Sequence, residues 1–265
     1  MVTAGTTIDL NCDLGESYGA WTLGGTDGDA ALLEVVTSAN VACGFHAGDP
    51  RTLQRTVAAA LEAGMTVGAQ VSYPDLVGFG RRAMDVAHDD LVADVLYQMG
   101  ALEAFCRVAG GRVAYVKPHG ALYNRVVDDP AQAAAVAEAV QRYDPSLPLL
   151  TLPESAMATA AEQAGLTVVG EGFADRGYTA AGRLASRREA GSVLHDADEV
   201  ATRAVRMAAG SVTALTGEPL AVAVGSICVH SDTPGAASLA RSVRQALQDD
   251  GWTVAAFARS QPVQP

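Results

Sequence analysis

Short runs of β-branched and apolar residues alternate along this chain with longer segments in which apolar residues recur at helical spacing. The alternation is typical of parallel strands joined by crossover helices, an α/β architecture. Seven strands are predicted, with an eighth candidate near the carboxyl end. They cover residues 7–12, 40–43, 66–71, 113–116, 149–152, 167–169 and 227–229, and the eighth covers residues 253–257.

An aspartate or threonine followed by proline marks the predicted start of three helices, at Asp49-Pro50, Asp129-Pro130 and Thr233-Pro234. The first residue of each pair offers a side-chain acceptor at the N-cap, and the proline lacks the N–H that would need a partner there. The helical pattern lapses between residues 173 and 195, which predicts a long loop, and residues 211–224 are predicted to form a hairpin.

One large domain spanning residues 1–265 is expected, because the chain contains no linker, fixed-period repeat or low-complexity segment. Its 30 Asp and Glu outnumber its 18 Lys and Arg, and the net charge of −12 would repel nucleic-acid phosphates and anionic membranes. The four cysteines show no C-x-x-C spacing and are expected to be reduced. Since no long apolar run is present either, a cytoplasmic location is expected.

Polar side chains gather at the end of almost every predicted strand. The carboxyl ends of parallel strands in α/β folds meet at one rim, where ligands bind, so these clusters are expected to converge on one pocket. The candidates are Asp9, Asn11, Asp13 and Glu16 on and after the first strand, His46 and Asp49 after the second, Lys117 and His119 after the fourth, Asp175 and Arg176 after the sixth, and His230 and Asp232 after the seventh.

Lys117 is the only lysine beside 17 arginines, which indicates a role for a compact charge or a neutral amine that a guanidinium does not fill. Three of the five histidines, His46, His119 and His230, lie just beyond strand ends. Their spacing matches no metal-binding motif, so the presence of a divalent metal is left open. No phosphate-binding loop of the G-x-x-x-x-G-K-[ST] kind is present.

Five motifs, in order along the chain, resemble the LamB/YcsF family. They are DLNCDLGE at residues 9–16, SANVACGFHAGDP at 38–50, KPHGALYN at 117–124, FADR at 173–176 and CVHSDTP at 228–234. The resemblance spans nearly the whole chain and implies a distorted, seven-stranded (β/α) barrel of the glycoside hydrolase/deacetylase kind. Gln70 and Ser231 depart from it, because many members carry histidine and glycine there.

The resemblance also implies the opening of 5-oxo-L-proline to L-glutamate with hydrolysis of ATP, accompanied by Mg²⁺, in a complex with partner subunits B and C. A five-membered lactam is a stable amide, and phosphorylation of its oxygen would turn that oxygen into a good leaving group. The residues expected to act in the chemistry are Asp13, Glu16, His46, Lys117, His119 and His230, and those expected to bind substrate are Asp9, Asn11, Asp49, Asp175, Arg176 and Asp232.

Two alternatives predict different behaviour. A metal-dependent deacetylase or amidohydrolase would hold a divalent ion and act without ATP, whereas a non-catalytic subunit would bind substrate while its partners hold the chemistry. The density of ionisable groups at one rim favours a catalytic role. Self-association into a homo-oligomer is left open by the sequence.

Overall fold

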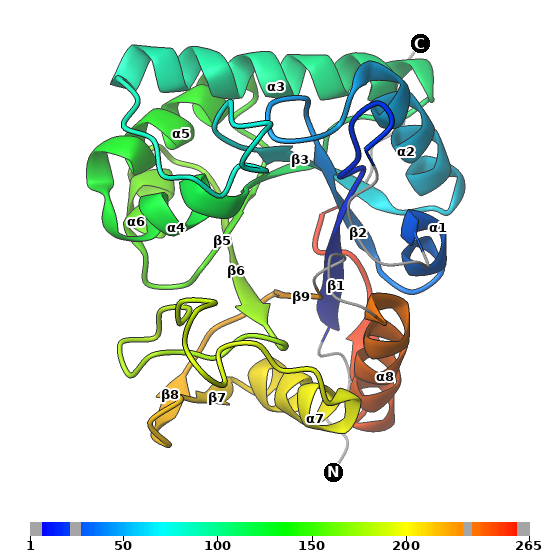
Figure 1. Ribbon diagram of the computed structural model, residues 1–265, viewed down its shortest axis with the longest axis vertical. Coiled ribbons are helices and arrows are strands. Elements are labelled where there is room, and N and C mark those ends of the chain that lie inside the picture. Colours follow the sequence, from blue (N-terminus) through cyan, green and yellow to red (C-terminus); the bar gives the residue numbers. More distant parts are fainter. Residues whose placement is uncertain (1–6, 22–27, 230–234, 259–265) are drawn as a thin grey trace.

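Seven parallel strands close into a barrel in the computed structural model, which describes residues 7–21, 28–229 and 235–258. The strand order is β1-β2-β3-β4-β5-β6-β9, and β9 pairs back onto β1 to close the ring. The eighth predicted strand is present as β10, which pairs with the first residues of β1 outside the ring. Helices surround the barrel on its outer side (Figure 1). The predicted seven-stranded barrel is therefore confirmed.

All eight predicted strands are present, most with shifted ends, and the predicted hairpin is the antiparallel pair β7 and β8. The strands are β1 (Thr7–Leu14), β2 (Ser38–Ala42), β3 (Thr66–Val71), β4 (Tyr115–Pro118), β5 (Leu149–Thr151), β6 (Val168–Phe173), β7 (Ser211–Thr213), β8 (Pro219–Ala221), β9 (Ser226–Cys228) and β10 (Thr253–Val254). The helices are α1 (Gly28–Leu33), α2 (Pro50–Glu62), α3 (His88–Val108), α4 (Gly120–Asp128), α5 (Pro130–Tyr143), α6 (Ala156–Gln163), α7 (Ala197–Ala208) and α8 (Ala236–Asp249). None of the described helices is long and apolar enough to cross a membrane.

Two of the three predicted helix starts are confirmed. The Asp49 carboxylate accepts the backbone N–H groups of Arg51 and Thr52 at the start of α2, and Asp129 caps α5 in the same way. The third prediction is wrong, because α8 begins at Ala236 with Gly235 as its N-cap in the left-handed region, at φ 78°. Glycine reaches that conformation without strain, so the helix starts two residues later than the Thr-Pro pair suggested.

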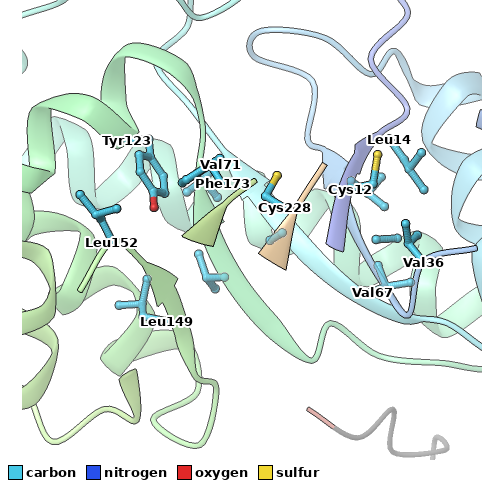
Figure 2. Packing of buried hydrophobic residues seen from close by; sticks show 14 of the residues in the cluster. Cys12, Leu14, Val36, Val67, Val71, Tyr123, Leu149, Leu152, Phe173 and Cys228 are labelled. Atoms are coloured by element: carbon cyan, nitrogen blue, oxygen red, sulfur yellow. The ribbon is translucent and has the colours of Figure 1, made fainter. Parts of the chain in front are cut away.

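The alternation of apolar and polar residues along β1 explains why the barrel interior is polar. Every residue from Ile8 to Leu14 is buried, because one face of the strand meets the surrounding helices and the other faces the barrel axis. Ile8, Leu10, Cys12 and Leu14 belong to the apolar core, where Figure 2 shows Cys12 and Leu14. The alternate residues, from Asp9 to Asp13, face the axis and hydrogen-bond to neighbouring strands.

Gly68 of β3 makes room for an aromatic ring inside the barrel. A Cβ atom at this position would lie 2.2 Å from the ring of Tyr115, so any larger residue would displace that ring. The ring of Tyr115 is fully buried, and its hydroxyl donates a 2.6 Å hydrogen bond to Oδ1 of Asn40. The tyrosine thereby packs the barrel below the polar side chains of the rim.

Candidate active site

Three tiers of polar side chains occupy the barrel between its middle and its rim. In the lowest tier, the carboxylate of Asp9 accepts hydrogen bonds from the hydroxyls of Thr37 and Ser38, both at 2.6 Å, and from the hydroxyl of Ser226. Burial raises the pKa of Asp9 to about 6, although the three hydroxyl donors stabilise its charged form. Asp9 is thus a carboxyl group that ionises in the folded barrel only near neutral pH.

The raised pKa of Asp9 predicts a pH-dependent stability. Because the folded-state pKa lies above the unfolded value, the stability of the wild type relative to Asp9→Asn is greatest near pH 4 and falls as the pH rises through 6. A shift of this size corresponds to on the order of 3 kcal/mol in the free energy of unfolding. Urea unfolding of both proteins between pH 4 and pH 7 measures the difference.

Asp49→Asn provides the control for this experiment. The carboxylate of Asp49 accepts hydrogen bonds from Thr52 and from the backbone N–H of Gly19, which lower the pKa of Asp49 to about 2. The ionisation of Asp49 therefore changes the stability of the protein only in solutions more acidic than those of the experiment. Asparagine caps helices nearly as well as aspartate. A difference between wild type and Asp9→Asn that stays constant with pH would contradict the ionisation of Asp9 near pH 6.

The middle tier is centred on the ammonium group of Lys117. Its Nζ atom lies 2.8 Å from Oε1 of Glu171 and 3.1 Å from Oδ1 of Asp13, and it donates a 3.3 Å hydrogen bond to Oδ1 of Asn11. Burial opposes the charge on this amine, but the two carboxylates outweigh burial and hold the pKa of Lys117 well above its usual range. Asn40 completes the tier by donating to Asn11 and Asp13. Lys117 is therefore a fixed positive charge, not a neutral amine.

In the upper tier, the amide of Gln70 connects Glu16 to two histidines. Its Nε2 atom donates a 3.0 Å hydrogen bond to Oε1 of Glu16 and lies 2.9 Å from Nδ1 of His119, while its Oε1 atom lies 3.2 Å from Nε2 of His46. All four side chains are buried. A single amide thus has contacts with three of the residues expected to act in the chemistry.

The carboxylate of Glu16 determines which proton each histidine carries. An ionised carboxylate accepts hydrogen bonds only, so the NH₂ group of Gln70 must face Glu16, and Nδ1 of His119 then accepts the second N–H. The amide oxygen of Gln70 requires a proton on Nε2 of His46. The carbonyl oxygen of Phe79, 3.3 Å from Nε2 of His119, independently requires the proton of His119 to lie on Nε2.

Of the two histidines, His46 is expected to be neutral at neutral pH. Their rings stack with centroids 4.1 Å apart and planes inclined by 13°, which disfavours two charges. Burial, reinforced by His119, lowers the pKa of His46 to about 4. Gly80, at φ +66°, covers both rings, because a Cβ there would lie 2.9 Å from Cβ of His46 and 3.1 Å from Cδ2 of His119. The loop after β3 therefore packs directly against both rings.

Gln70→Leu is expected to remove the preference of His46 and His119 for a single tautomer. Loss of the amide removes the groups that hold Nδ1 of His119 as an acceptor and Nε2 of His46 as a donor, and we expect kcat to fall by about 10- to 100-fold, as for other residues that orient catalytic imidazoles. Long-range ¹H–¹⁵N spectra of the imidazoles report the tautomers directly and should show a mixture in the variant. Gln132→Leu, which removes another buried glutamine that hydrogen-bonds Tyr73, is the control. Unchanged imidazole spectra in Gln70→Leu would contradict the assignment.

Glu16, His46 and His119 also form the group of described residues with the donors of a metal site. Their ligand atoms lie within 4.8 Å of one another, and two imidazoles with a carboxylate are a set that zinc accepts. The amide of Gln70 already hydrogen-bonds to all three, and Nε2 of His46 holds a proton instead of a free lone pair. As arranged here, the three side chains do not fit a metal ion unless Gln70 turns away.

A pocket of about 560 Å³ opens above these tiers, a size suited to a small-molecule ligand. Asp13, Lys117 and His119 lie at its base, and one face of α4 along its whole length forms one wall. Residues 183–188, from the long loop after β6, form another part of the lining. Tyr123 and Phe173, whose rings meet edge to face with centroids 5.5 Å apart, add an aromatic surface.

The structure brings some of the predicted site residues together and separates others. Those that line the pocket are Asp13, Lys117, His119 and Arg176. Those that are buried behind the lining and support it are Asn11, Glu16 and His46. Asp9 belongs to the lowest tier, Asp49 is a helix cap, and Asp175 is buried away from the lining. His230 and Asp232 lie outside the described residues.

Several residues of the site received no role from the sequence. Gln70 and Glu171 lie within strands, and their alternation with apolar neighbours is the signal that points both toward the barrel axis. Asn40 is found by the same alternation on β2. Arg187 and Arg188 lie in the long loop, where no periodicity indicates the direction of a side chain.

Comparison with known proteins identifies the family. The family model described as LamB/YcsF family matches residues 8–262. The A subunit of 5-oxoprolinase from Streptomyces coelicolor is 59% identical to this chain over 252 residues, 95% of this chain and 100% of that protein, and the corresponding protein of Mycolicibacterium gilvum is 55% identical over 253 residues, 95% and 99% of the two chains. The crystal structure of the lactam utilization protein from Thermus thermophilus shares 46% identity and superposes with a TM-score of 0.90, covering 95% of this chain and 100% of that one. The chain therefore belongs to the LamB/YcsF family.

Proposed function

We propose that this chain is the A subunit of an ATP-dependent 5-oxoprolinase, which opens 5-oxo-L-proline to L-glutamate together with partner subunits B and C. Relatives that carry the name of the 5-oxoprolinase A subunit align over nearly the whole length of both chains, which supports the proposal. The observation that carries it is the pocket base, where an ammonium group, a carboxylate and an imidazole lie together beneath a small-molecule cavity.

The reaction needs three kinds of assistance, and the pocket offers each of them. The carboxylate of the substrate needs a cation, for which Arg176 and Lys117 are the nearest candidates at the lining. Negative charge that develops on the lactam oxygen is stabilised by a fixed positive charge, as Lys117 provides. A water molecule needs a group that accepts its proton, and the carboxylate of Asp13 at the pocket base is suited to that role, with the Nε2–H of His119 beside it as a hydrogen-bond donor.

ATP, with Mg²⁺ as its counter-ion, would supply the phosphoryl group that activates the lactam oxygen. Attack of a first water on the ring carbon then breaks the bond to the ring nitrogen, which takes a proton and becomes the amine of glutamate. A second water releases inorganic phosphate from the resulting acyl phosphate. In this scheme Asp13 takes a proton from the attacking water, His119 donates a hydrogen bond through its Nε2–H, and Glu16 and Gln70 keep the imidazole oriented.

Add-back to a deficient extract tests the proposal. Glutamate release from 5-oxoproline and ATP is measured in an extract of source cells that lack this gene, with and without the purified chain, after subunits B and C have been verified by immunoblot. Release that depends on the chain and on ATP supports the proposal. Failure of the wild-type chain to restore release overturns it.

The cluster of Glu16, His46 and His119 favours one second candidate, a metal-dependent amidohydrolase that acts without ATP. That enzyme would carry about one zinc or similar ion per chain and would lose activity on chelation. The engagement of all three side chains by Gln70 argues against it. Metal analysis of the purified chain, together with assays of N-acyl substrates without ATP, separates the two candidates.

A further inference from the structure

The pocket above the barrel is positively charged, although the protein as a whole carries a net charge of −12. Six of the 18 Lys and Arg residues of the chain line this single cavity, against two carboxylates. The cations are Arg81, Lys117, Arg176, Arg183, Arg187 and Arg188, and the carboxylates are Asp13 and Asp128. An acidic protein that gathers a third of its cations around one cavity has a local field suited to an anion.

The two carboxylates do not neutralise this charge. Asp13 is paired with Lys117 at 3.1 Å, and Asp128 accepts a 2.9 Å hydrogen bond from Arg183. Within the described part of the chain, the guanidinium groups of Arg187 and Arg188 have no carboxylate or carbonyl partner, and both residues are exposed at the mouth of the pocket. Glu171 lies 2.8 Å from Nζ of Lys117 as a further buried carboxylate at the base, so the uncompensated positive charge lies with Arg187 and Arg188 at the mouth.

Arg176 holds the arginine-rich loop over the pocket. Its guanidinium donates hydrogen bonds to the carbonyl oxygens of Ala185, at 2.7 Å, and Ser192, at 3.2 Å, which fixes the loop on either side of Arg187 and Arg188. Burial, and then the nearby charge of Arg187, lower the pKa of Arg176 to about 10, and Arg81 acts in the same direction. The guanidinium groups are therefore close enough to repel one another, and an anion placed among them would relieve that repulsion.

The amount of surplus charge distinguishes between anions. The single carboxylate of 5-oxoproline requires one cation, whereas a chain of phosphates carries several negative charges at neutral pH and pairs well with planar guanidinium groups. The base of the pocket lies directly beneath, so a phosphate chain held at the mouth would present its terminal phosphorus toward Lys117 and His119.

We propose that the mouth of this pocket is a polyphosphate-binding site in which Arg187 and Arg188, on a loop held in place by Arg176, bind the phosphate chain of a nucleoside triphosphate. The inference rests on the proposed function for the identity of the nucleotide, but the site itself is defined by its charge. In the proposed site, arginine side chains from the loop after β6 make the phosphate contacts that a glycine-rich phosphate loop provides in other proteins.

Calorimetric titration of the purified full-length chain tests the site with inorganic tripolyphosphate, ATP and adenosine as separate probes. Tripolyphosphate and ATP are expected to bind with affinities within a few fold of each other and to weaken steeply as salt rises, whereas adenosine alone is expected not to bind. The double variant Arg187→Gln/Arg188→Gln is expected to weaken both anions at least tenfold. The control is Arg206→Gln/Arg241→Gln, which removes the same charge from exposed residues outside the pocket and should change affinity less than twofold.

Three results would overturn the inference: absence of tripolyphosphate binding, an equal loss in the control variant, or ATP binding that the pocket variant leaves intact. Glutamate release in the add-back extract shows whether the polyphosphate site alone has failed or whether the proposed function has failed as well. Release without binding of tripolyphosphate overturns only the polyphosphate site. Binding without release, with subunits B and C present, supports the site and overturns the proposed function.

Discussion

Replacement of Lys117 by methionine is expected to destabilise the protein and to abolish most of its activity. Methionine has a similar length but no charge, so Asp13 and Glu171 would remain buried without a cation. Removal of one partner from a buried ion pair lowers the free energy of unfolding by about 3–5 kcal/mol. The loss of a fixed charge at the reacting oxygen should lower kcat by about 10²- to 10³-fold. Urea unfolding and glutamate release measure the two effects.

A second substitution separates the two effects of Lys117. Lys117→Met/Glu171→Gln removes one of the two uncompensated charges, so it should recover part of the stability while activity stays low. Arg241→Met, at an exposed pair with Glu34, controls for the loss of a surface cation. If Lys117→Met unfolds at the same urea concentration as the wild type, the buried charges do not depend on Lys117 as described.

Replacement of His119 by alanine is expected to lower kcat of the reconstituted complex by about 10²- to 10⁴-fold, the range of a group that takes part in general acid–base catalysis. His119 is the histidine that lines the pocket among the described residues, whereas His46 is completely buried behind it. The variant should still fold, because the ring that it loses borders the pocket and the space left behind is continuous with that pocket. Glutamate release at saturating 5-oxoproline and ATP gives kcat, and circular dichroism gives the folded fraction.

His88→Ala is the matched control for this experiment. His88 lies at the start of α3, where its exposed ring pairs with Glu138 at 2.9 Å, far from the pocket lining. It should leave kcat unchanged, because exposed pairs contribute little even to stability. Activity of His119→Ala within a few fold of the wild type would show that His119 takes no part in the proton transfer.

The strands and their positions along the chain could be predicted from the sequence because the signals are local. Apolar runs interrupted by helical periodicity indicate each strand, and the two Asp-Pro pairs indicate the starts of α2 and α5. Prediction failed at α8, where a left-handed glycine two residues downstream caps the helix in place of the Thr-Pro pair. The local signal there was present, but a competing cap determined the start.

The sequence by itself determined that polar side chains follow the strands, and therefore that Asp13, Lys117 and His119 would meet at one rim. Only the tertiary structure decided which of the other polar residues join them. Asp49 became a helix cap and Asp9 a buried group of the lowest tier, while Gln70 came to bridge Glu16, His46 and His119. The physical reason is that strand position sets only the height of a side chain in the barrel, whereas its partners depend on closure of the ring and on the path of the loops, both of which bring together residues far apart in the chain.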